Sequence, residues 1–316
     1  MGVDSVTDAY SDIIDQYVDD CEIRGMSPSC HRHYVSHVKM FASFLKPREV
    51  SFQEVENEDL IEFIRYLRLG RKLSSASLKN YLSALNSLYE YLQFSKQTKH
   101  NLVPAIRKRY MKQYKKQDGN GNRRKVIPPR DMGKFLNSIV SPRDKAIATL
   151  LVKSGIRRNE LISIDIDDIN WREYSIRLKD KKKRTNTLVF FDGECARVLR
   201  QWLEVRDTLF FENDNPALFY GRDGGRLQRN GVYMAVTEWA KKTGIFDVKS
   251  KQNHHHFSPH NLRHCFTTYL LENGMPREYV QELRGDAHKD AVDIYNHISP
   301  EKLREAYLLA MPQFGL

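Results

Sequence analysis

Residues 258–264 combine a helix start with two side chains that bind anions. Ser258 is suited to cap a helix, and Pro259 is suited to its first position. A helix that begins there places His260 and Arg263 three residues apart on one face. The free N–H groups and the positive dipole end at such a terminus favour an anion. The pattern predicts a phosphodiester site, although an isolated His-x-x-Arg would more often be an ordinary exposed helix start.

Two further segments accompany this pattern. Arg157 directly follows Gly155 and Ile156, and Tyr295 lies among polar residues near the C-terminus. With them, the sequence resembles the tyrosine recombinase (phage integrase) family, whose members carry Gly-Leu-Arg-x-x-Glu-Leu, then His-x-Leu-Arg-His, then a tyrosine in an Ile-Tyr-x-His context. The resemblance covers residues 127–316, and its spacing and tail are most similar to archaeal and Xer-like members.

The resemblance implies roles for individual residues. Arg157 matches the first catalytic arginine, and Glu160 matches the acid that supports it. His260 and Arg263 match the second motif. Tyr295 matches the nucleophile that attacks the DNA phosphate.

For three of the family's positions, more than one residue of this sequence is a candidate. Arg158 is the neighbour most easily confused with Arg157, and Tyr279 is the rival tyrosine, although its spacing looks like helix packing. The family's hairpin lysine falls within residues 179–183, where Lys181 is favoured and Lys182 and Lys183 remain open.

One position departs from the family pattern. Members commonly have a histidine or tryptophan about nine residues before the tyrosine, and here Asp286 occupies that place. Either Asp286 accepts a hydrogen bond there, or a local shift brings in His288. We expect Asp286 to fill the position, where a carboxylate would not supply the second neutral hydrogen-bond donor to the phosphate.

The chemistry that the resemblance implies suits these side chains. A free tyrosine has a pKa of about 10 and is a poor nucleophile at neutral pH without nearby positive charge. Arg157 and Arg263 would hold the non-bridging phosphate oxygens. Lys181 would protonate the departing 5′ oxygen while His260 assists proton transfer at the tyrosine. The 3′-phosphotyrosyl product keeps the energy of the broken bond, so neither a cofactor nor a metal is expected.

Other classes of protein compete with this interpretation. Acidic residues at 165, 167 and 168 could belong to a two-metal nuclease, but acidic turns before strands are common. Histidines at 254–256, 260 and 264 could bind zinc, but helical spacing supports only the last two. A non-catalytic DNA-binding protein would not need Tyr295 and both arginines. A type IB topoisomerase shares the chemistry and remains the nearest enzymatic alternative.

The elements that must position these residues form two domains. Residues 1–112 carry four apolar stripes at helical spacing, the clearest within 78–92, which predict a helical bundle. It fits the family's SAM-like core-DNA-binding domain. Residues 113–126 are basic and rich in turn formers, which indicates a flexible linker. Residues 127–316 predict a mixed α/β catalytic domain, so the fold class is mainly α with a small β-sheet.

Patterns within the second domain locate its elements. Alternating residues at 174–179 and 185–191 predict two strands joined by a basic hairpin tip at 180–184. Helices are expected near 141–153, 194–206, 228–242 and from 258 onwards. A last short helix at 300–311 has an apolar stripe of Leu303, Tyr307 and Leu308. Family members dock such a tail into the neighbouring subunit of a tetramer, which we expect here over a tail that folds back.

The composition excludes several classes of protein and indicates a cellular compartment. The 316 residues are 41% hydrophobic, which excludes a mostly disordered chain, and no apolar run approaches the roughly 18 residues of a membrane span. The acidic N-terminus does not look like a signal peptide, and four cysteines without a Cys-x-x-Cys pair suggest reduced thiols. We therefore expect a cytoplasmic protein. A net charge of +11 suggests a polyanionic partner, here double-stranded DNA.

Overall fold

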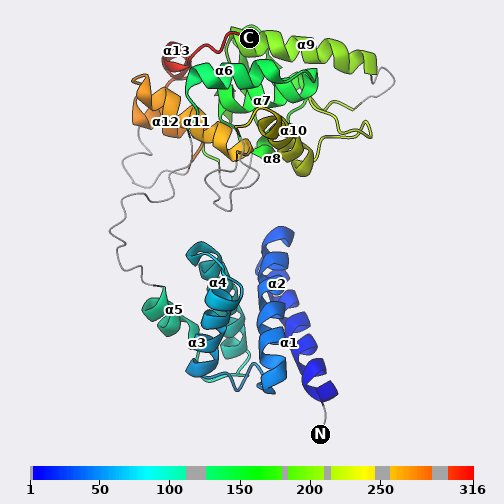
Figure 1. Ribbon diagram of the computed structural model, residues 1–316, viewed down its shortest axis with the longest axis vertical. Coiled ribbons are helices and arrows are strands. Elements are labelled where there is room, and N and C mark those ends of the chain that lie inside the picture. Colours follow the sequence, from blue (N-terminus) through cyan, green and yellow to red (C-terminus); the bar gives the residue numbers. More distant parts are fainter. Residues whose placement is uncertain (1–2, 112–125, 180–183, 210–214, 246–256, 287–297) are drawn as a thin grey trace. The chain divides into compact units, whose positions relative to one another are not determined.

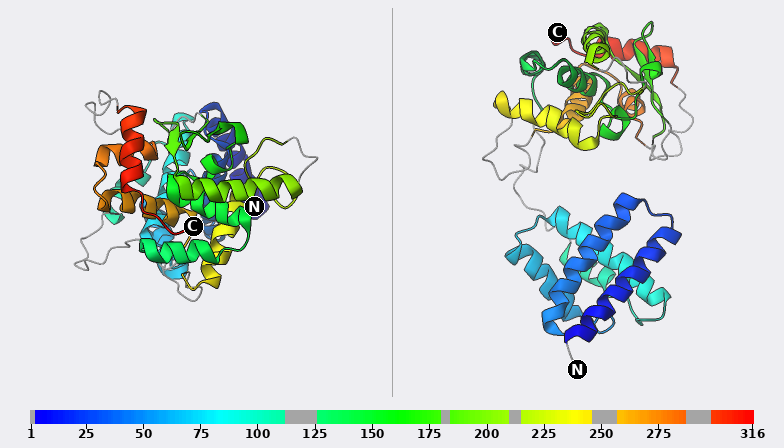
Figure 2. Two further views of the ribbon diagram at one scale, coloured as in Figure 1. Left: turned by 90° about the horizontal axis from the view of Figure 1, so that it is seen from above. Right: turned by 90° about the vertical axis from the view of Figure 1, so that its right-hand side faces the viewer.

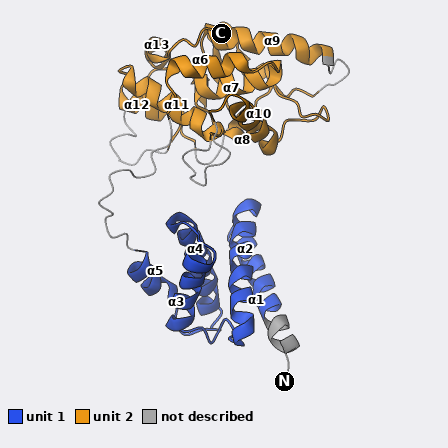
Figure 3. Cartoon of the chain, viewed as in Figure 1, with its two compact units in different colours: residues 1–119 blue, residues 120–316 orange. Residues whose placement is uncertain are grey.

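The structure is a computed structural model that describes residues 3–111, 126–179, 184–209, 215–245, 257–286 and 298–316 (Figure 1). The chain forms two compact units, residues 1–119 and 120–316 (Figure 3). The expected linker at 113–126 lies almost entirely outside the described residues, so its boundaries stay predictions. Among the described residues, no helix is both long enough and apolar enough to cross a membrane.

The first unit is helical, as its apolar stripes predict. It contains α1 (Val3–Ile23), α2 (Pro28–Leu45), the 3-10 turn η1 (Lys46–Arg48), α3 (Asn57–Arg65), the π-helical turn η2 (Tyr66–Gly70), α4 (Ser75–Phe94) and α5 (Val103–Tyr110). The N-cap Ser74 accepts a hydrogen bond from the backbone N–H of Ser77, which starts α4. The leucines of α4 at 78, 82, 85, 88 and 92 are buried. The clearest predicted stripe is therefore the core face of this unit.

The second unit adds helices around a small sheet. Its helices are α6 (Pro129–Ser138), α7 (Pro142–Ser154), α8 (Arg158–Leu161), α9 (Gly193–Leu209), α10 (Arg229–Lys242), α11 (Pro259–Glu272), α12 (Arg277–Arg284) and α13 (Pro300–Ala310). The central helix is α7, which packs against α9, α10 and α11. Because residues 146–154 of α7 are all buried, this part of the helix has no solvent-facing side. It starts at the N-cap Ser141 and ends at Gly155, as predicted.

The sheet is antiparallel, in the order β1 (Ile169–Asn170), β2 (Ser175–Arg177), β3 (Leu188–Phe190), and the 3-10 turn η3 (Ile166–Asp168) precedes it. Ile176 pairs with Val189, and the N–H of Leu178 donates to the carbonyl of Thr187 at 2.8 Å. The predicted hairpin is therefore present, with shorter strands than expected. The expected fold class, mainly α with a small sheet, is confirmed.

The last helix packs against its own unit. Figure 2 shows α13 beside α12, and the two helices are in contact. Leu303 and Tyr307 are buried, whereas Leu308 is exposed. The Tyr307 hydroxyl donates to the carbonyl of Lys153 at 2.8 Å. Two of the three residues of the predicted stripe are thus covered within the chain, and exchange of the helix into a neighbouring subunit stays a prediction.

The residues after α13 continue along the same unit. The Glu194 carboxylate accepts the backbone N–H groups of Phe314, Gly315 and Leu316 at 2.6–3.0 Å. It also pairs with the fully buried Lys153 ammonium at 2.8 Å. A nearly buried ion pair therefore holds this segment, and its charged groups have the partners that burial requires.

Candidate active site

The turn after α7 places the first predicted arginine. Gly155 has a φ of +63°, and a Cβ there would lie 2.3 Å from the Phe266 ring of α11, so the position needs glycine. The chain then reaches Arg157, whose backbone N–H donates to Oε2 of Glu160 at 2.7 Å. Its Nη1 donates to Oε1 of Glu160 at 2.9 Å. The expected arginine and its acid are therefore in direct contact.

The second arginine lies on α11, whose start follows the predicted pattern. The backbone N–H and hydroxyl of Ser258 both donate to Oδ1 of Asn261, which closes the first turn. Arg263 is only 5% exposed. Its Nη1 donates to the carbonyl of Gly155, so the two arginine-bearing segments are joined directly. His260 lies three residues earlier and is exposed.

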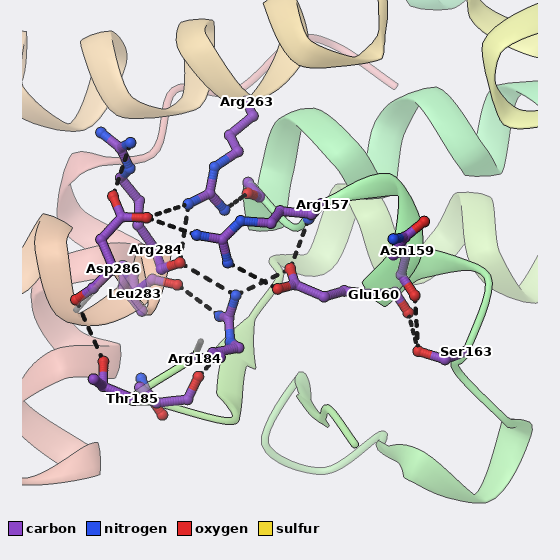
Figure 4. Close-up of polar contacts among 12 residues, drawn as sticks. Arg157, Asn159, Glu160, Ser163, Arg184, Thr185, Arg263, Leu283, Arg284 and Asp286 are labelled. Carbon is purple, nitrogen blue, oxygen red and sulfur yellow. Dashed lines mark hydrogen bonds and ion pairs between the residues drawn. The ribbon is translucent and has the colours of Figure 1, made fainter. Parts of the chain in front are cut away.

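Asp286 lies between the two arginines (Figure 4). Its Oδ1 accepts Nη2 of Arg157 at 2.7 Å and Nη2 of Arg263 at 3.1 Å. Its Oδ2 pairs with Nη2 of Arg284 at 2.8 Å. The carboxylate therefore fills the position in which an anion can bind both arginines at once. His288, the alternative for this position, lies outside the described residues.

The electrostatics of the cluster follow from burial and from its mixed charges. Burial lowers the pKa of Arg263 to about 10, and the nearby charge of Arg157 acts in the same direction. The guanidinium still carries its charge at neutral pH. Burial alone would raise the pKa of Glu160, but the charge of Arg184 and the hydrogen bonds from Arg157 outweigh it and lower that pKa. Glu160 is thus ionised and shared between two guanidinium groups.

Arg184 is a member of this cluster that the sequence interpretation missed. It follows three lysines in the segment predicted as a basic hairpin tip, and it is buried. Its Nη1 donates to Oε2 of Glu160 at 3.0 Å, and its Nη2 donates to the carbonyl of Leu283 at 2.9 Å. Both partners are distant in sequence, so no local pattern reveals the contact.

Other predicted residues are not part of the described cluster. Lys181 and Tyr295 lie outside the described residues, as do the alternatives Lys182 and Lys183. Tyr279, the rival nucleophile, is half-buried on α12 and packs against the apolar cluster that includes Val280 and Leu283, as expected for a packing residue.

Two of the acidic residues that could belong to a nuclease, Asp165 and Asp168, have partners within the protein. Asp165 pairs with Lys179 and with Arg226, and its backbone N–H donates to Oδ2 of Asp168. Within the described residues, no three His, Cys, Asp or Glu side chains form a metal-binding group. Residues 254–256, the possible zinc ligands, lie outside those ranges. The observed contacts of Asp165 therefore favour a structural role.

The sequence of this chain is similar to known protein families and to individual proteins. Residues 125–302 match the phage integrase family, and residues 13–100 match its N-terminal SAM-like domain. A tyrosine recombinase XerC of Corynebacterium glutamicum is 35% identical over 196 residues, which cover 60% of this chain and 59% of the relative. A tyrosine recombinase XerC of Histophilus somni is 26% identical over 92% of this chain and 93% of the relative.

Solved structures share the fold. A lambda integrase dimer bound to a core site has a TM-score of 0.67 at 16% identity, over 92% of this chain and 98% of that one. The XerH recombinase bound to its difH substrate has a TM-score of 0.63 at 24% identity, over 93% of this chain and 83% of that one. The family match covers more than half of the chain, including both arginines and Asp286. The chain therefore belongs to the phage integrase family, the tyrosine recombinases.

Proposed function

We propose that this tyrosine recombinase cleaves and rejoins double-stranded DNA at a specific site, through a 3′-phosphotyrosyl intermediate and a Holliday junction. The observation that carries the proposal is the convergence of Arg157 and Arg263 on one anionic oxygen, Oδ1 of Asp286. Two guanidinium groups on one oxygen form a site for a phosphodiester, since arginine N–H groups match phosphate geometry.

The proposed reaction uses residues in distinct roles. The Tyr295 oxygen forms a bond to phosphorus as the bond from phosphorus to the 5′ oxygen breaks. Arg157 and Arg263 stabilise charge on the non-bridging oxygens. Lys181 gives a proton to the departing 5′ oxygen, and His260 assists proton transfer at the tyrosine. The 5′ hydroxyl of another strand then reverses these steps and releases the tyrosine.

Asp286 acts before the DNA phosphate arrives. Its carboxylate orients both arginines in the free protein, and it carries the same sign of charge as a phosphodiester. The phosphate and Oδ1 of Asp286 therefore compete for the same N–H groups. Arg284, which pairs with Oδ2, offers the carboxylate a partner after it leaves the other two arginines.

The proposal extends to how the protein assembles on DNA and to its biological role. We propose a tetramer on DNA, a cytoplasmic setting, and a basic linker at 113–126 that follows the phosphate backbone. Both XerC relatives described above are bacterial, so they give no support to the expected likeness to archaeal members. Mobile-element integration and resolution of chromosome or plasmid dimers both fit the proposed chemistry.

Covalent trapping tests the function. A nicked suicide substrate with the recognition site should give a denaturation-resistant protein–DNA adduct in the presence of EDTA. Tyr295→Phe should bind the DNA normally and give no adduct. An adduct that survives this change, or that maps to Tyr279, would refute the assignment. Loss of the wild-type adduct on chelation would instead support metal-dependent cleavage.

A further inference from the structure

Arg184 joins three segments that the sequence places far apart. Its side chain is 1% exposed and lies four residues before β3 (Leu188–Phe190). Its Nη1 donates to Oε2 of Glu160 at 3.0 Å and to the carbonyl of Arg284 at 3.2 Å. Its Nη2 donates to the carbonyl of Leu283 at 2.9 Å, and its Nε donates to the carbonyl of Asn186. One guanidinium therefore connects α8, the hairpin and the end of α12.

We propose that Arg184 is a positioning residue for strand cleavage, which acts on Arg157 through Glu160. This inference rests on the proposed function. Glu160 has two oxygens: Oε1 accepts Nη1 of Arg157, and Oε2 accepts both the Arg157 backbone N–H and Arg184. Arg184 thus fixes the carboxylate that fixes Arg157.

The end of α12 is shaped around the same side chain. Gly285 has a φ of +57°, and a Cβ there would lie 2.5 Å from Cγ of Arg184. Arg184 also donates to the carbonyls of Leu283 and Arg284, three and two residues before Asp286. The position of Asp286 between the arginines therefore depends on Arg184 as well.

A lysine could not replace these contacts. The guanidinium donates in several fixed directions in one plane, whereas an ammonium is a compact point charge on a flexible stem. Arg184 needs that planar fork because a carboxylate and three backbone carbonyls surround it. Removing it leaves those buried acceptors without their donor and lets Glu160 shift, which moves Arg157 relative to the phosphate.

The test compares Arg184→Met with a matched buried arginine. Arg206, also buried in the second unit, donates to the carbonyls of Ala217 and Asn215 at 3.2 and 2.9 Å, in contacts separate from those of Arg184. Single-turnover cleavage of the suicide substrate is measured at saturating protein, together with the Kd for DNA. Arg184→Met should slow cleavage by about 10²-fold, the usual effect of a misplaced catalytic group, with Kd changed less than threefold. Arg206→Met should cleave at close to the wild-type rate once corrected for folded protein.

A second substrate separates positioning from a loss of folded enzyme. A methylphosphonate at the cleavage site replaces one charged non-bridging oxygen with a methyl group. The reacting group then carries less negative charge for Arg157 and Arg263 to stabilise. The Arg184→Met defect should shrink at least tenfold on this substrate. An equal defect on both substrates, or a wild-type rate on the phosphodiester, would overturn the inference.

A second variant tests the inference if the first does not fold. If Arg184→Met does not fold by circular dichroism, Gly285→Ala replaces it, because the added Cβ displaces Arg184 while the guanidinium is kept. It should give the same substrate-dependent defect, and an equal defect on both substrates would again overturn the inference. No adduct from the wild type and from Arg206→Met would refute the proposed function, and the inference with it.

Discussion

Arg157 and Asp286 are 129 residues apart in the chain, yet Nη2 of the arginine donates to Oδ1 of the aspartate at 2.7 Å. The same oxygen accepts a hydrogen bond from Arg263. An internal anion thus pairs with both guanidinium groups in the free protein. For Arg263, whose side chain is 6% exposed, a charge without a partner would be costly. DNA must replace this contact for both arginines to hold a phosphate.

Removing the internal charge should strengthen DNA binding. Asp286→Asn keeps the size of the side chain but no longer competes with the phosphate for Arg157 and Arg263. We expect the Kd for recognition-site DNA to fall by about fivefold or more, the lower range of coupling between competing sites. Fluorescence anisotropy at fixed salt measures the change. Glu278→Gln is the control, since it alters net charge equally at an exposed position of α12. Equal tightening by both variants would contradict direct competition.

The hairpin lysines can be separated by chemistry at the leaving group. If Lys181 is the general acid, Lys181→Ala should slow cleavage by roughly 10²–10⁴-fold. A 5′-phosphorothiolate leaves without a proton, so this substrate should restore the rate. Lys182→Ala and Lys183→Ala should mainly weaken DNA binding. Thiolate rescue of either of these variants would move the assignment by one or two residues.

The ion pairs of Glu160 predict a pH-dependent stability. Its pKa is lowered from the ordinary value of 4.5, so its stabilising effect is complete above that value and is lost as pH falls through the lowered pKa. Glu160→Gln should reduce the free energy of unfolding by about 3 kcal/mol near neutral pH. Urea denaturation should show this difference shrinking below about pH 4. The exposed Glu305→Gln variant should show little change, and a pH-independent Glu160→Gln effect would contradict the prediction.

Engineered cysteines can detect exchange of the tail. Asn273 donates to the carbonyl of Ala310 at 2.7 Å, so these two positions adjoin when α13 packs within its own chain. Asn273→Cys with Ala310→Cys should form an intramolecular disulfide without DNA. If α13 exchanges on recombination-site DNA, the same pair should give covalent multimers on a non-reducing gel. Ala310→Cys alone controls for the native cysteines, and an exclusively intramolecular disulfide in the assembled complex would refute exchange.

Local signals made much of the catalytic unit predictable. Ser141 and Ser258 each precede a proline and cap α7 and α11, because capping depends on neighbouring residues. Gly155 ends α7 for the same local reason. These predictions place Arg157 at the end of one helix and Arg263 near the start of another. The catalytic roles of both arginines stay predictions.

Contacts between distant segments were not predictable. The basic run before Thr185 predicts a hairpin tip with concentrated positive charge and does not single out Arg184, which is buried because Glu160 and the end of α12 surround it. Strand β1 is only two residues long and too short to show an alternating pattern. The spacing from Tyr295 selected Asp286 for its position, but only the fold shows that it meets both arginines.

Two backbone carbonyls at the C-terminal end of α7 accept hydrogen bonds from α13 and from α11. The carbonyl of Lys153 accepts a hydrogen bond from the Tyr307 hydroxyl of α13. Two residues later, the carbonyl of Gly155 accepts one from Nη1 of Arg263. Displacement of α13 would remove a buried hydrogen bond within one helical turn of the carbonyl that accepts Nη1 of Arg263. Both hydrogen bonds depend on the position of this helix end, so a movement of α13 that shifted it would also move the carbonyl that holds Arg263.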